Sequence, residues 1–243
     1  MMDDKLPLSF TSKMTKRECI LALCWLPVHV FLLPNLAVPL LNRGLLTDLQ
    51  VNVLVYALGA VFMLISAFSF LRREFDPLCD RLAYCLSVVL SSYFLMMGCN
   101  LCVSWLLSLL ANVLEDAALL VNQNNAAILD LAGEDYGVMA AMAVFLAPLI
   151  EEPIFRGAVF GSLRAKNRAA AYAASVLLFA LYHVWPYAMA APVYWLFILQ
   201  YVPAGFLLAR CYEKTNSIWC SIFFHMLVNG VSMKMLSALQ EIV

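Results

Sequence analysis

Long apolar runs are the feature that most limits what this chain can fold into. Seven stretches carry few charges, and most of them approach the length of about 20 residues that a helix needs to cross a bilayer. They are residues 20–41, 49–71, 82–110, 137–163, 169–184, 192–210 and 217–236. Hydrophobic residues make up 64% of the chain and charged residues 13%. The sequence therefore predicts an all-α, polytopic integral membrane protein with about seven transmembrane helices.

Basic residues are distributed unevenly between the segments that join these runs. If the N-terminus is cytoplasmic, the inner segments hold twelve Lys and Arg residues and the outer segments only Arg43 and Lys234. The twelve are Lys5, Lys13, Lys16, Arg17, Arg72, Arg73, Arg81, Arg164, Lys166, Arg168, Arg210 and Lys214. Positive charge favours the cytoplasmic side. We therefore expect a multi-pass protein of the cell membrane with its N-terminus in the cytoplasm. The net charge of −1 gives no support for nucleic acid as a partner.

Two adjacent carboxylates and an arginine lie inside the fourth apolar run. Ionisable groups at that depth are costly and mark functional sites by default. Glu152 and Arg156 are four residues apart on one helix face and can pair. Glu151 is turned about 100° away and stays outside that pair. Pro153 has no amide hydrogen, so it leaves the carbonyl of Leu149 without its helical partner. This stretch is interpreted as a charged, partly hydrated pocket within the membrane.

Three further polar residues fall at a similar depth in other runs. A rise of about 1.5 Å per residue places Glu151, His183, His225 and Asn229 in one layer. Taken singly, each histidine and Asn229 can be explained as a hydrogen-bonding contact between helices. Taken together, a carboxylate, two imidazoles and an amide are the parts of a hydrolase that activates water. Glu151, His183 and His225 are also suitable zinc ligands. The absence of a His-Glu-x-x-His helix, and the position of Asn229 one turn from His225, favour a metal-free site with no cofactor over a zinc site.

The motifs resemble those of a known family. Glu151-Glu152-x-x-x-Arg156, Phe179-x-x-x-His183 and His225-x-x-x-Asn229 are similar to the three-motif signature of the CPBP family. The name stands for CAAX proteases and bacteriocin-processing proteins, also called the ABI family, and includes the type II CAAX prenyl endopeptidases. The resemblance covers residues 147–229, and Pro153 replaces a residue that is more often aliphatic in the family.

The resemblance implies an intramembrane glutamic endopeptidase. Glu151 would be the water-activating base with His183 as its partner, and His225 and Asn229 would form the oxyanion site. Glu152 and Arg156 would have a supporting role. The implied substrate is a peptide or a membrane-associated protein. Residues 1–136 would be an N-terminal set of helices with an exterior acidic loop, and residues 137–243 the catalytic helical core.

Two other functions use the same residues. A non-catalytic scaffold or bacteriocin-immunity protein could bind a partner in the pocket. A transporter could use the Glu and His residues as a proton relay. A transporter of this kind often has paired halves with similar broken helices, and the sequence has no such repeat.

Overall fold

The computed structural model describes residues 9–240, and no strand occurs among them. Six helices in this part of the chain are long and apolar enough to cross a membrane. They are Lys16–Asn42, Asp48–Ser66, Leu82–Leu114, Tyr136–Arg164, Arg168–Ala188 and Pro192–Thr215. The predicted all-α polytopic membrane fold is confirmed. The seventh predicted span forms helix α13, Ile218–Gln240, which is not among the six, so the count of seven is not confirmed.

Three of the long helices change their winding along their length. The first consists of α1 (Lys16–Pro27), the π-helix η1 (Val28–Leu32) and α2 (Leu33–Asn42). The fourth runs through α8, η3, α9, η4 and α10. Their bounds are Tyr136–Ala141, Met142–Leu146, Ala147–Glu152, Pro153–Phe160 and Gly161–Arg164. The sixth starts as the 3₁₀ helix η5 (Pro192–Phe197) and continues as α12 (Ile198–Thr215).

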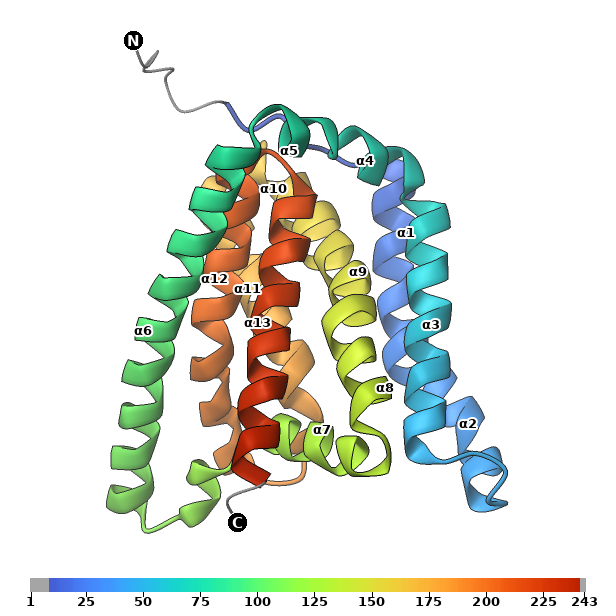
Figure 1. Cartoon of the computed structure of the whole chain (residues 1–243), viewed down its shortest axis with the longest axis vertical. Coiled ribbons are helices and arrows are strands. Elements are labelled where there is room, and N and C mark those ends of the chain that lie inside the picture. The colour runs from blue at the N-terminus through green and yellow to red at the C-terminus, as the bar shows by residue number, and fades with distance from the viewer. Residues whose placement is uncertain (1–8, 241–243) are drawn as a thin grey trace.

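The connections are partly helical themselves. The helix α3 (Asp48–Ser66) is shorter than the predicted span 49–71, because the chain turns at Ala67 before α4 (Phe68–Arg73). The helices α5 (Asp76–Asp80) and α6 (Leu82–Leu114) follow. The predicted exterior loop instead contains η2 (Ala117–Leu120) and α7 (Gln123–Glu134). Figure 1 shows α4 and α5 at one end of the bundle and α7 at the other.

Helix starts follow from capping residues in the sequence. Thr15 and Glu18 form a capping box that starts α1, and Thr47 and Gln50 form one that starts α3. The side chain of Asn167 accepts a hydrogen bond from Ala170 and starts α11 (Arg168–Ala188). Each cap satisfies amide groups that have no partner within the helix.

One apolar core joins the two halves of the chain. Its buried residues come from α1, α3, α4, α5 and α6 as well as from α9, η4, α11, α12 and α13. The helix α1 packs against η4, and α3 packs against α9, so the N-terminal helices hold the charged stretch from outside. The proposed division at residue 136 stays a prediction. Lys5, one of the basic residues used to predict orientation, lies outside the described residues.

Candidate active site

The charged stretch lies where the fourth long helix changes from α to π winding. Pro153 begins η4, and the amide of Gly161 donates to the carbonyl of Arg156, five residues back. A proline inside a helix removes one backbone hydrogen bond, and a π-type turn is one way to adapt to that loss. The glutamates at positions 151 and 152 lie directly before this change, and both are buried. The local geometry thus places two carboxylates inside the bundle.

Glu152 is the fully bonded member of the two. Its carboxylate accepts hydrogen bonds from Arg156 Nη1 at 3.0 Å, Ser221 Oγ at 2.5 Å and His225 Nδ1 at 2.8 Å. Neither Glu152 nor Arg156 has any exposed surface. The predicted pair between them is present. The contact with Ser221 was not predicted, although Ser221, His225 and Asn229 follow one another at helical spacing of four.

Arg156 is held from three sides. Besides Glu152, it donates from Nη2 to the carbonyl of Gly205 at 3.2 Å. Its guanidinium lies 4.3 Å from the centre of the Phe179 ring. A buried arginine needs such partners because its charge has no water to solvate it. The Arg156 side chain therefore links η4 to α11 and α12.

Glu151 faces two histidines from different helices. Its Oε2 lies 3.8 Å from His183 Nε2 on α11 and 3.9 Å from His225 Nε2 on α13. These distances exceed those of direct hydrogen bonds, and separations of this size suit a bridging water. Within residues 9–240, Glu151 Oε2 is buried and has no hydrogen-bond partner. The structure thus brings three of the predicted site residues together around one unpaired oxygen.

The other ring nitrogens fix how the histidines face this oxygen. His183 Nδ1 lies 2.8 Å from the carbonyl of Phe179, and a carbonyl can only accept, so Nδ1 donates. His225 Nδ1 donates to Glu152 by the same reasoning, since that carboxylate is paired with Arg156. In each neutral ring, Nε2 therefore carries a lone pair toward Glu151. Protonation would turn either Nε2 into a donor.

Asn229 is hydrogen-bonded to the backbone of a neighbouring helix. Its Nδ2 donates to the carbonyl of Ala143 at 2.8 Å, and among the described residues no hydrogen bond joins it to Glu151 or either histidine. Ala143 lies in the π-helix η3, where the amide of Ala147 bonds to Met142. In that register the partner of Ala143 would be residue 148, a proline without an amide hydrogen. Asn229 thus satisfies a carbonyl that the helix leaves unpaired.

His29, the remaining one of the three histidines of the chain, also has a polar partner. Its Nε2 lies 3.1 Å from the Tyr182 hydroxyl, which is 3.4 Å from the Tyr56 hydroxyl. These contacts pair residues of η1, α3 and α11. Sequence spacing cannot show such a contact because it joins three separate helices.

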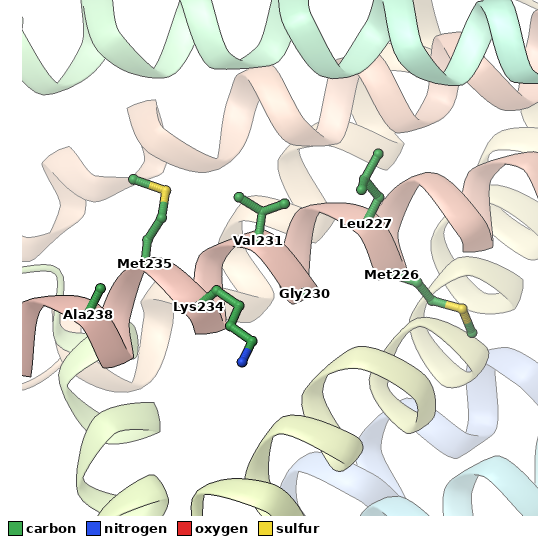
Figure 2. Close-up of a pocket in the computed structure, with 7 residues that line it drawn as sticks. All are labelled: Met226, Leu227, Gly230, Val231, Lys234, Met235 and Ala238. Carbon is green, nitrogen blue, oxygen red and sulfur yellow. The ribbon is translucent and has the colours of Figure 1, made fainter.

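An apolar groove of about 500 Å³ runs along α13 (Figure 2). Its lining residues are Met226, Leu227, Gly230, Val231, Lys234, Met235 and Ala238. Lys234 is the charged residue among them. The groove begins beside His225, but Glu151 and both histidines lie outside its lining. Its composition is apolar, so it is a surface feature next to the polar layer and not the layer itself.

By residue type, Glu151, His183 and His225 are also candidate zinc ligands. No group of three or more His, Cys, Asp or Glu residues within residues 9–240 is placed to hold a metal ion. That the site works without a metal or cofactor stays a prediction, because only measurements of activity can test it.

The region that carries the predicted site residues is similar to a known protein family. The model of the family "Type II CAAX prenyl endopeptidase Rce1-like" matches residues 134–231. The matched region, about two fifths of the chain, is therefore similar to the Rce1-like family. The predicted family relationship is confirmed, and the Rce1-like region contains all six predicted site residues.

A curated relative matches a region of similar size. The chain is 33% identical over 109 residues to a Bacillus subtilis protein named "Putative membrane peptidase YdiL". The match covers 44% of this chain and 41% of that relative, so it spans about two fifths of the relative's length. No solved structure matches the chain.

Proposed function

We propose that this protein is a membrane endopeptidase in which Glu151 activates water to cleave a peptide bond. The observation that carries the proposal is the placement of one buried, unpaired carboxylate oxygen 3.8 and 3.9 Å from the Nε2 atoms of His183 and His225. A water between these groups could contact all three. The Rce1-like family match and the peptidase name of the relative support the same function.

The proposed reaction is a general-base hydrolysis. Glu151 takes a proton from the water, while the lone pair of His183 Nε2 accepts a hydrogen bond from it and orients it. The oxygen of the water attacks the carbonyl carbon of the substrate and forms a tetrahedral oxyanion. The C–N bond then breaks, and the proton held by Glu151 passes to the leaving amine. The products are a carboxylic acid and an amine.

The oxyanion would be stabilised by His225. When protonated, His225 donates from Nε2, and its positive charge is supported by the Glu152 carboxylate at Nδ1. Asn229 uses one of its two amide hydrogens for Ala143. The second amide hydrogen is the one that would have to reach the oxyanion. The roles of His225 and Asn229 are those proposed from the family motifs.

Comparison of membranes with and without Glu151 would test the proposal. We would compare peptide termini by proteomics from cells carrying the wild-type protein, Glu151→Gln or Asp130→Asn. Asp130 is exposed on α7 and serves as a matched carboxylate control. We expect new termini with wild type and Asp130→Asn but none with Glu151→Gln. Identical termini with all three proteins would favour the scaffold or immunity function, in which the pocket binds without cleaving.

The orientation in the membrane is a separate proposal. The distribution of basic residues favours an orientation with residues 164–168 in the cytoplasm and α7 outside. Single cysteines replacing the exposed residues Lys166 and Asp130 in a cysteine-free background would test it. A membrane-impermeant thiol reagent added to intact cells should label position 130 only. Labelling of position 166 alone would show that the protein has the opposite orientation.

A further inference from the structure

The ring of His183 is enclosed by aromatic side chains. Tyr201, on α12, is stacked on it with the ring centres 4.6 Å apart and the planes at 24°. Phe179 lies 4.5 Å away at 50°, and Tyr182 meets the ring at 85°. The hydrogen bond from His183 Nδ1 to the Phe179 carbonyl fixes the position of one ring nitrogen, but it does not fix the tilt of the ring plane. The stacked Tyr201 ring sets the plane of the imidazole.

Tyr201 is in turn tied to the segment before α7. Its hydroxyl donates to Asn122 Oδ1 at 3.3 Å, and the same oxygen accepts the amide of Asn125 at 3.1 Å. Asn122 Nδ2 donates to the Gln200 side chain. The side-chain oxygen of Asn122 thus uses both of its acceptor positions, and the amide is anchored to the residue next to Tyr201. Asn122 connects the start of α7 to the tyrosine on His183.

A small cavity lies beside these residues. It measures about 10 Å³ and is lined in part by Asn122, His183, Tyr194 and Tyr201. A cavity of that size is about the volume that one water centre can occupy. The ring of His183 therefore has little room to move on this side as long as Tyr201 stays in place.

We propose that Tyr201 and Asn122 are positioning residues for His183. The stacked ring of Tyr201, held by Asn122, keeps His183 Nε2 directed at Glu151. This inference rests on the proposed hydrolytic function for its kinetic consequence, although the placement of the ring can be measured without activity. Neither residue contacts the reacting atoms, so both act through the orientation of His183.

Steady-state kinetics of purified protein on a substrate identified by proteomics would test the consequence. Tyr201→Phe keeps the stacked ring and loses the hydrogen bond, whereas Tyr201→Leu loses both. We expect kcat to fall about tenfold in Tyr201→Phe and about a hundredfold in Tyr201→Leu, because small misplacements cost this much. KM should change much less than kcat, because the proposal assigns both residues to the orientation of His183.

A set of variants at residue 122 shows whether the two residues act together. Asn122→Ala should lower kcat at least as much as Tyr201→Phe, because it removes the hydrogen bond from Tyr201 and also those with Asn125 and Gln200. The double variant should fall no further than Asn122→Ala, because the Tyr201–Asn122 hydrogen bond is already lost there. Asn122→Asp should restore kcat, since its carboxylate accepts from Tyr201 and Asn125 and a flipped Gln200 amide can donate to it. Tyr194→Phe is the control, because among the described residues its hydroxyl makes no hydrogen bond.

A second measurement does not depend on cleavage. The chain has three histidines, so ¹⁵N-histidine labelling in detergent gives three imidazole signals, and His183→Gln assigns one of them. Tyr201→Leu and Asn122→Ala should shift or broaden the His183 signal and leave those of His29 and His225 in place. Tyr194→Phe should change none.

The kinetic and spectroscopic measurements distinguish a wrong positioning role from a wrong proposed function. An unchanged His183 signal in folded Tyr201→Leu would overturn the positioning role, whatever the activity. A wild-type protein without Glu151-dependent cleavage would overturn the proposed function, while the spectra would still decide the placement of the ring. Wild-type kcat in Tyr201→Leu, with cleavage that depends on Glu151, would overturn the positioning role alone.

Discussion

At the scale of single residues, the two adjacent glutamates differ in what surrounds each carboxylate. Glu152 accepts three hydrogen bonds inside the bundle, including one from the charged Arg156. Glu151 faces two imidazole nitrogens at distances that leave space between them. A buried charge with a full set of partners contributes to folding, whereas a buried oxygen without partners costs stability and marks a functional position.

Removing the charge of Glu152 should therefore impair folding. Glu152→Gln leaves Arg156 buried without a counter-charge, at a cost of roughly 3–5 kcal/mol for a well-desolvated pair. We expect a lower yield of folded protein by size-exclusion chromatography in detergent, together with loss of activity. The adjacent Glu151→Gln is the control and should fold with normal yield but fail to cleave. Equal yields for the two variants would contradict this division.

Chelation would distinguish the two chemistries that the sequence leaves open for these residues. A zinc site would use Glu151, His183 and His225 with water as the fourth ligand. A glutamate mechanism uses these groups without an ion. We expect activity to survive extended dialysis against a chelator, and elemental analysis to find no stoichiometric zinc. If chelation abolished activity and added zinc restored it, His183 and His225 would be zinc ligands and the glutamate mechanism would be wrong.

At the scale of elements, close packing between helices determines where the candidate site residues lie. The helix α3 meets α9 at Gly59, where an added Cβ would lie 2.6 Å from Ile150 Cδ1 and 3.0 Å from Trp25 Nε1. Ile150 is buried and directly precedes Glu151. Overpacking a tight core costs about 1–3 kcal/mol. This contact couples an N-terminal helix to the position of the Glu151 carboxylate.

Gly59→Ala should therefore lower both stability and activity. The added methyl group pushes on Ile150 and moves the turn that carries Glu151. We expect a lower apparent melting temperature and a kcat reduced by about tenfold, because small misplacements of a catalytic group are costly. Gly98→Ala, on α6, has no atom within 4 Å of the added carbon and should change neither. A Gly59→Ala protein with wild-type melting temperature would show that Ile150 adapts freely.

Several elements of this fold could be predicted from the sequence. Apolar length predicted most of the helices, and spacing of four predicted the Glu152–Arg156 pair. The π-helices η3 and η4 could not be predicted, because a 3.6-residue period assumes uniform winding. The partners of Asn229 and His225 were missed for the same reason and because they lie on other helices. The stacking of Tyr201 on His183 leaves no pattern in the sequence.

At the scale of the whole molecule, the N-terminal segment closes one end of the bundle. The side chain of Asn216, between α12 and α13, accepts the amide of Thr11 at 2.9 Å and donates to the carbonyl of Ser9 at 3.1 Å. Met14 is buried against Gly157 in η4, where no larger residue would fit without moving it. The first described residues thus reach the helix that carries the glutamates.

Glu74 is a buried carboxyl group in this closure. It lies between α4 and α5 and is 6% exposed. Its carboxylate accepts the Ser12 hydroxyl at 2.5 Å, and Ser12 also contacts the Tyr212 hydroxyl. Burial raises the pKa of Glu74 to about 7, although hydrogen bonds from Ser12 and the amide of Ile218 and the charge of Arg73 act against it. The fold therefore favours the protonated carboxyl.

This raised pKa predicts how stability depends on pH. Between the ordinary pKa near 4.5 and the raised value near 7, the folded state binds more protons than the unfolded state. The free energy of unfolding should then decrease as pH rises through this range, by at most about 1.4 kcal/mol per pH unit for one group. Glu74→Gln keeps a neutral side chain of the same shape. Its apparent melting temperature should depend less on pH between 5 and 7.5 and should exceed that of the wild type above pH 7. Ser12→Ala, which removes the hydroxyl and leaves the carboxyl, should keep the pH dependence. If the apparent melting temperatures of wild type and Glu74→Gln changed equally with pH, Glu74 would not be the source of the pH dependence.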